Sequence, residues 1–175
     1  IRYFWHMSIQ MDAPPEAPVF PEGFTVRNFI VGQDDYPSYE AVEEAFADHW
    51  RHSRSTFEEW QRRTVEREDF DPALWHIALD GDTIAGVAST SYRGGKPWVR
   101  GLSVRRPWRR RGLGLALLLT VFAEFYRRGD RQVALGVDAA SPTGATHLYE
   151  RAGMKATREY VILEKPLPRV VKSNE

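Results

Sequence analysis

The chain has 175 residues, 42% hydrophobic and 27% charged, which suits one globular domain with its own core. The 24 Lys and Arg residues balance 24 Asp and Glu residues, which argues against a dedicated nucleic-acid-binding protein, since such domains are usually strongly basic. The absence of cysteine excludes disulfides, thiolate metal sites and a cysteine nucleophile. No apolar run approaches the ~20 residues of a membrane-spanning helix, and the start lacks a secretory signal pattern, so we expect a cytoplasmic protein without a membrane partner.

Hydrophobic periodicity and turn residues predict alternating strands and helices, and hence a mixed α/β domain. In the first helix, Tyr39, Val42 and Phe46 recur at spacings of three and four, and Thr56 with Glu59 forms a capping-box signature for the second. In chain order we predict strands at 1–11 and 24–29, helices at 34–50 and 56–68, strands at 74–79, 83–91 and 98–104, a helix at 113–128, a strand at 132–137, a helix at 143–152, and one or two strands at 155–163.

The neutral total charge hides two oppositely charged segments. Residues 83–123 contain eight basic residues and no acidic one, a charge of +8. Residues 34–71 contain twelve carboxylates against five arginines. Because a charge run is often only a solvated surface, this asymmetry alone leaves open both a solvated face and a binding site for anions.

A glycine-rich turn, Arg109-Arg-Arg-Gly112-Leu-Gly114, lies between a predicted strand and a predicted helix. The first N–H groups of a helix lack internal partners, so an anion there gains hydrogen bonds and the favourable end of the helix dipole. Glycine lets a phosphate approach the backbone, and arginine offers planar donors for phosphate oxygens. Two glycines alone also fit an ordinary tight turn with solvated arginines. A dinucleotide-binding fingerprint would need a third glycine in phase, which is absent.

Two segments together resemble signatures of the GNAT superfamily of N-acetyltransferases. Arg109-x-x-Gly112-x-Gly114 resembles the family's pyrophosphate loop, Arg/Gln-x-x-Gly-x-Gly/Ala, and residues 145–154 resemble its pattern Ala-x-x-Leu-Tyr-x-x-x-Gly-Phe, with Met154 at the last position. The resemblance extends over residues 24–167. It implies an α/β GNAT fold, with a mixed and mostly antiparallel central sheet of six to seven strands flanked by about four helices.

The resemblance also implies acetyl-CoA as co-substrate and a small primary amine as the acceptor, which attacks directly. Tyr149 would act as the general acid for the departing thiolate, a role open to a phenol near a developing thiolate. Backbone groups of Leu102 and Val104 would bind the pantetheine arm, and Ser141 would replace, more weakly, an Asn common in the family. The implied phosphate loop consists of Arg109, Arg110, Arg111, Gly112, Leu113, Gly114 and Leu115.

In this family the helices after the first strand line the acceptor pocket, and here they are acidic, which would favour a cationic amine. Glu43 is our candidate general base, and His49, Trp50 and His52 are candidate substrate-binding residues. For residues of these types, an ordinary surface or packing role is the more common one. No histidine pair has carboxylate partners at a recognised ligand spacing, so we expect no metal.

The opening segment, residues 2–9, resembles the closing segment, residues 158–165, because both are apolar and led by arginine and an aromatic residue. In tandem GNAT proteins, mycothiol synthases among them, each domain ends with such a strand. We therefore expect a preceding GNAT domain or a homodimer as partner. The predicted boundaries are 1–12 for a remnant or exchanged strand, 13–23 for a proline-rich linker, 24–167 for the GNAT domain and 168–175 for a tail.

Two other functions fit the sequence. One is a GNAT domain that binds CoA without catalysis, as one half of a tandem protein. The other is a phospholigand or nucleic-acid binding module that uses the arginine-rich segment, for which we would expect strongly salt-dependent binding without any need for acetyl-CoA.

Overall fold

The computed structural model describes residues 1–49, 52–141 and 144–163. The predicted substrate residue Trp50 and the predicted tail therefore lie outside the described residues. The strands are β1 (Arg2–Gln10), β2 (Phe24–Asn28), β3 (His76–Asp80), β4 (Thr83–Arg93), β5 (Lys96–Val104), β6 (Gln132–Asp138) and β7 (Lys155–Ile162). The α-helices are α1 (Asp35–Phe46), α2 (Phe57–Arg63), α3 (Leu113–Arg127) and α4 (Ala145–Arg151), with short 3-10 turns at Pro72–Leu74 and Arg106–Trp108.

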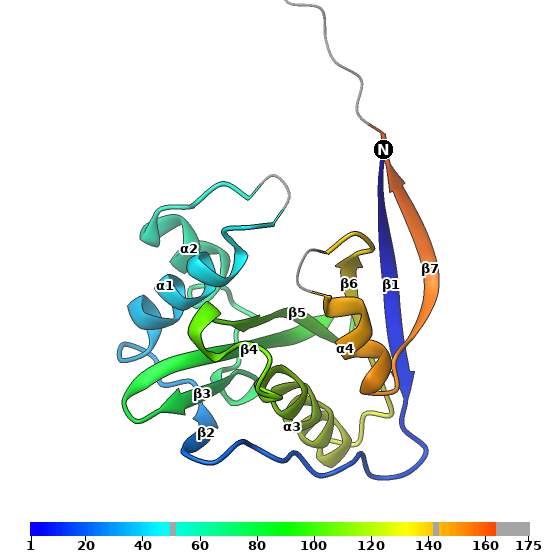
Figure 1. Cartoon of the computed structure of the whole chain (residues 1–175), viewed down its shortest axis with the longest axis horizontal. Helices are drawn as coiled ribbons and strands as arrows, with labels where there is room; N and C mark the ends of the chain where they lie inside the picture. Colours follow the sequence, from blue (N-terminus) through cyan, green and yellow to red (C-terminus); the bar gives the residue numbers. More distant parts are fainter. Residues whose placement is uncertain (50–51, 142–143, 164–175) are drawn as a thin grey trace, which may run out of the picture.

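The described strands form one sheet in the order β2-β3-β4-β5-β6-β1-β7 (Figure 1). The pair β5 and β6 is parallel, and each other pair of neighbours is antiparallel. A parallel pair needs a crossover connection, and α3 supplies it. The predicted architecture, a mixed and mostly antiparallel sheet with flanking helices, is confirmed.

Helices cover both faces of the sheet around β4 and β5. A Cβ atom added to Gly86 of β4 would lie 3.0 Å from Leu117 of α3, whereas one added to Gly101 of β5 would lie 3.9 Å from Phe46 of α1. Gly86 is paired with Val104, and Val104 and Gly101 lie on opposite faces because side chains alternate along a strand. The fully buried side chains of α3 include Leu117, Leu118, Phe122 and Phe125, which form the core against the sheet.

Both N-terminal helices end earlier than the periodicity predicts. The first ends at Phe46 instead of residue 50, because Asp48 is turned toward Arg106 and the guanidinium of Arg109 takes the carbonyl of Ala45. The second ends at Arg63 instead of residue 68, because the Arg63 carbonyl accepts a hydrogen bond from Arg100. Its start is as predicted, with both capping-box hydrogen bonds between Thr56 and Glu59 present.

The strand β1 lies inside the sheet of this chain, between β6 and β7. It pairs antiparallel with both of these strands, and Met7 at its centre is fully buried. Residues 11–23, which follow it, form neither helix nor strand. The N-terminal strand is therefore part of the sheet rather than an exposed extension.

Candidate functional site

A gap opens in the sheet where β5 and β6 part. The two strands pair only at Trp98 with Ala134 and Val99 with Leu135. Immediately beyond Val99, the β4–β5 register shifts so that Arg100 is bulged out between Val99 and Gly101, and a bulge bends the strand that carries it. From Arg100 to Val104, the edge of β5 that faces β6 has no strand partner among the described residues. Apart from the Val104 carbonyl, which accepts a hydrogen bond from Arg109, the backbone donors and acceptors of this edge are open for an extended ligand.

The turn from β5 into α3 closes one end of this gap. Gly112 is the N-cap of α3 with φ of 86°, and Arg110 also has a positive φ, 59°. Left-handed backbone at two nearby positions gives the sharp turn that starts the helix, and only glycine adopts it without strain. The first N–H groups of α3 therefore lie at the start of a fifteen-residue helix, the arrangement that suits a phosphate group.

The two glycines of this turn have different structural roles. A Cβ atom on Gly112 would meet nothing within 4 Å, so the positive φ alone requires glycine there. A Cβ atom on Gly114 would lie 2.8 Å from Leu148 of α4. Gly114 therefore lets α3 and α4 approach closely. From the sequence, only a role in phosphate contact was predicted for this glycine.

Three arginines before the turn are held by α1 and the residues that follow it. Arg105 pairs with Glu44 at 2.7 Å and Arg106 pairs with Asp48. Arg109 donates to the carbonyls of Val104 and Ala45, both at 3.0 Å. Because its guanidinium is engaged in this way, Arg109 contributes to the loop by fixing its backbone against α1.

Arg110 and Arg111 differ from these neighbours. No ion pair engages either side chain within residues 1–49, 52–141 and 144–163, and Arg111 is exposed. Glu44 and Asp48 thus neutralise part of the +8 segment. Arg110 and Arg111 place unpaired positive charge at the helix start.

The helix α4 carries Tyr149 to the other side of the gap. This helix packs on α3 through Leu148 and Gly114, and Gly153 in the turn after the helix lies against Ile9 of β1. Because α3 packs on β3, β4 and β5, the two helices flank the gap on one face of the sheet. Tyr149 is 8% exposed, and burial raises its pKa to about 12. The phenol therefore stays protonated at neutral pH and is able to donate a proton.

The opposite face of the gap carries a buried carboxylate. Glu43 of α1 is 6% exposed, and its two oxygens have different partners. One accepts a hydrogen bond from the Ser55 hydroxyl at 2.8 Å, and the other lies 2.9 Å from Nε2 of His52. Both oxygens are thus occupied, and Glu43 joins α1 to the loop that leads into α2.

His49 lies beside this cluster, with its ring 4.6 Å from that of Phe46. Burial lowers the pKa of His49, while Asp138 at the end of β6 acts in the opposite direction. His52 and Arg109 also lower the pKa of this ring and Asp48 raises it, each by no more than Asp138 does. A neutral imidazole thus lies just after the end of α1, close enough to Asp138 at the end of β6 for the charge of that residue to act on it.

The chain is similar to proteins of known family. The profile of the acetyltransferase (GNAT) family matches residues 39–154, which include the bulge, the glycine turn and Tyr149. The chain belongs to the acetyltransferase (GNAT) family. The resemblance inferred from the two motifs is therefore confirmed, and the fold described above is that of GNAT enzymes.

Several GNAT relatives are about twice as long as this chain. It is 31% identical to a mycothiol acetyltransferase of Cellulomonas flavigena, over 95% of this chain and 51% of the relative. It is 35% identical to one of Streptomyces scabiei, over 81% of this chain and 46% of the relative. The chain thus spans about half the length of these curated relatives.

Solved structures agree with the fold. A GCN5-related N-acetyltransferase from Sphaerobacter thermophilus is 48% identical with a TM-score of 0.81, and the match covers 91% of this chain and 50% of that one. A tandem GNAT protein from the clavulanic acid biosynthesis pathway has a TM-score of 0.67 at 16% identity, with 89% of this chain and 50% of that one covered. The second likeness concerns the fold alone.

The structure brings together two groups of residues named from the sequence. Leu102, Val104 and residues 109–115 adjoin the gap on the α3 side, and Glu43 and His52 form one cluster on the α1 side. Ser141 lies in the turn after β6, where its N–H donates to the carbonyl of Asp138 at 3.0 Å. Its role toward the cofactor stays a prediction.

The sequence did not point to three residues that the structure places around the gap: Phe46 above Gly101, the bulged Arg100 and Asp138. A glycine inside a predicted strand is a signal for a bulge or a close approach, and Gly101 carried that signal. In the described part of the chain no group of three or more His, Asp or Glu residues is placed to hold a metal ion. None of the described helices is long and apolar enough to cross a membrane.

Proposed function

We propose that this chain transfers an acetyl group from acetyl-CoA to a primary amine by direct attack within the gap between β5 and β6. The observation that carries the proposal is the coincidence, at one gap, of an unpaired strand edge, a left-handed glycine turn at the start of α3 and a buried protonated phenol. An extended thioester with a diphosphate at one end matches all three in shape and charge.

The cofactor would be held chiefly by backbone groups. The N–H groups at the start of α3 would bind the diphosphate, and Arg110 and Arg111 would balance further negative charge. The unpaired edge of β5 at Leu102 and Val104 would hydrogen-bond the pantetheine amides as a neighbouring strand does.

The two proton transfers would use residues on opposite faces of the sheet. The nitrogen of the neutral amine attacks the thioester carbon, the carbon–sulfur bond breaks, and the Tyr149 hydroxyl gives its proton to the leaving sulfur. The proton released from the nitrogen goes to the neutral imidazole of His49, directly or through water. Glu43, with both oxygens engaged, would position His52 and the loop, and we assign the role of base to His49 instead.

Calorimetric titration with acetyl-CoA tests the proposal, with dephospho-CoA and ATP as controls. We expect saturable micromolar binding that weakens without the 3′-phosphate, followed by release of CoA thiol when amines are added. Absence of binding by the folded chain would overturn the proposal. Binding without turnover by any amine would favour the non-catalytic alternative.

We also propose that the chain is one domain of a tandem GNAT protein, with β1 derived from the end of a preceding domain. The support is the half-length match to the curated relatives and the likeness between β1 and β7. The mass of the intact gene product tests this, and a translated length near 175 residues would contradict it.

A further inference from the structure

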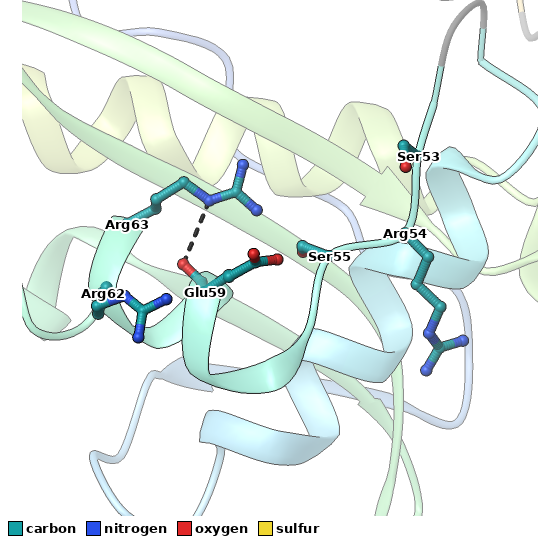
Figure 2. A pocket seen from close by; sticks show the side chains of 6 residues that line it. All are labelled: Ser53, Arg54, Ser55, Glu59, Arg62 and Arg63. Carbon is teal, nitrogen blue, oxygen red and sulfur yellow. Dashed lines mark hydrogen bonds between the residues drawn. The ribbon is translucent and has the colours of Figure 1, made fainter.

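A groove of about 420 Å³ lies between α2 and the loop that leads into it. Ser53, Arg54 and Ser55 line it from the loop, and Glu59, Arg62 and Arg63 line it from α2 (Figure 2). The groove therefore has two opposed walls on neighbouring segments of chain, and neither of the two GNAT motifs contributes to it.

The groove is positively charged, with three guanidinium groups against one carboxylate. Arg54 is already paired with Glu40, and Figure 2 shows its side chain directed away from α2. Glu59 uses one oxygen to accept the N–H of Thr56 in the capping box, at 3.0 Å. No ion pair engages Arg62 or Arg63 in the described part of the chain.

These two arginines keep donors for a ligand. Arg63 uses Nε for the carbonyl of Glu59 at 3.2 Å, which leaves its terminal nitrogens available (Figure 2). Arg62 has no hydrogen bond to a described residue. Paired guanidinium groups next to serine hydroxyls suit a carboxylate or a phosphate, since charge-assisted hydrogen bonds to such oxygens are strong and directional.

The groove is connected to the gap at two points. The bulged Arg100 donates to the carbonyl of Arg63 at 3.2 Å, so the end of α2 lies next to the point where β5 leaves β6. Ser55, which lines the groove, donates to Glu43, the partner of His52. A molecule bound in the groove would therefore extend toward the acceptor side of the gap.

Three of the acidic residues expected to attract a cationic amine are engaged elsewhere. Glu43 is bonded to Ser55 and His52, Glu44 to Arg105, and Asp48 to Arg106. These pairings reduce the carboxylate excess counted over residues 34–71, while Arg62 and Arg63 have no ion pair in the described part of the chain. The substrate class follows from the unpaired groups rather than from composition.

We propose that the groove binds the anionic group of the acceptor, so that the substrate is an amine that also carries a carboxylate or a phosphate. This inference rests on the proposed acetyl transfer and narrows its substrate class. Arg62 and Arg63 are the specificity-determining residues, and the amine extends from the groove toward His49 and the gap.

Matched acceptor pairs test the substrate class with the whole chain and acetyl-CoA. Ethanolamine is compared with its phosphate ester, and an amino acid with its amide, by the rate of CoA release. We expect kcat/KM to be at least about tenfold higher for the anionic member of at least one pair, chiefly through KM. The pair that shows this preference identifies the bound group as a phosphate or a carboxylate.

The double variant Arg62→Gln/Arg63→Gln should remove that preference, so that the ratio of kcat/KM between the anionic and neutral members of the pair falls to about one. The matched control Arg127→Gln/Arg151→Gln changes two exposed arginines on α3 and α4 and should keep the preference. Equal kcat/KM for neutral and anionic acceptors, or a preference that survives the Arg62/Arg63 change, would overturn the proposal.

A second measurement needs neither turnover nor acetyl-CoA. Inorganic phosphate is titrated into the ¹⁵N-labelled chain, with and without CoA, and the amide signals of residues 53–55 and 59–63 are followed. We expect saturable shifts there that persist with CoA and are lost in Arg62→Gln/Arg63→Gln. Absence of these shifts, or equal shifts in the variant, would refute the proposal that the groove binds an anionic group. Failure of acetyl-CoA to bind while the phosphate shifts persist would instead refute the proposed acetyl transfer.

Discussion

The two faces of the gap are built in different ways. On the face proposed to hold the cofactor, the strand edge, the turn and the start of α3 follow one another within β5 and the residues up to 115. Its proposed contacts are mostly backbone groups. On the face proposed for the acceptor, Glu43 contacts His52 and Ser55, and Arg100 donates a hydrogen bond to the carbonyl of Arg63. Binding through backbone geometry depends on local chain conformation, whereas binding through side chains depends on which distant segments meet.

The largest expected effect is on the cofactor face. Tyr149→Phe should lower kcat by roughly 10²-fold, the low end for general acid catalysis, with little change in cofactor affinity. Steady-state kinetics and acetyl-CoA titration check this, and Tyr126→Phe on α3 is the control, expected to retain turnover. Unchanged kcat in Tyr149→Phe would remove this residue from the chemistry.

On the acceptor face, His49→Gln should lower kcat/KM by about tenfold near neutral pH, less than the roughly 10²-fold usual for a general base because solvent can also take the proton. Since burial lowers the pKa of His49, the wild-type rate should fall only when the pH drops below the ordinary histidine range. The variant should lose that acid limb, and His147→Gln on α4 should keep it. An identical pH profile in His49→Gln would assign the base elsewhere.

Gly112→Ala separates backbone geometry from side-chain contact. A φ of 86° costs an alanine about 1 kcal/mol. If the turn of the free variant relaxes and must return to this φ on binding, we expect acetyl-CoA affinity to fall by roughly fivefold. Gly32→Ala is closely matched, with φ of 83° and equally open surroundings, but lies far from the turn in sequence. It should lower stability similarly and leave the affinity unchanged. Equal affinity losses in both variants would show that the turn has no special role.

The smallest expected effect is on stability at acid pH. Measuring it separates loss of activity through unfolding from loss of activity through protonation of His49. His76 of β3 is 7% exposed, its Nδ1 has no partner, and burial lowers its pKa, opposed by Glu124 and reinforced by Arg128. As the pH falls below the ordinary histidine pKa, the unfolded state binds a proton that the folded state resists, so stability decreases. Urea unfolding of His76→Leu should show a weaker decrease toward acid pH than the wild type. A decrease as steep as that of the wild type would exclude His76 as its source.

Sequence patterns predicted what depends on neighbouring residues. The capping box of Thr56 and Glu59, the apolar helix α3 and the glycine turn were all placed correctly, because each depends on propensities and spacing within a few residues. The ends of α1 and α2 were predicted too late. The contacts that end them come from Arg100, Arg106 and Arg109, which are distant in sequence.

The site shows the same division. The sequence by itself determined the family and the backbone turn for the phosphates, since positive φ and a free helix start are local properties of glycine and of chain direction. Only the tertiary structure decided which charges stay free: it paired Glu44 and Asp48 with arginines and left Arg62 and Arg63 unpaired beside the acceptor face. Pairing is decided by which side chains the fold brings within a few ångströms, because electrostatic interactions weaken with distance and screening.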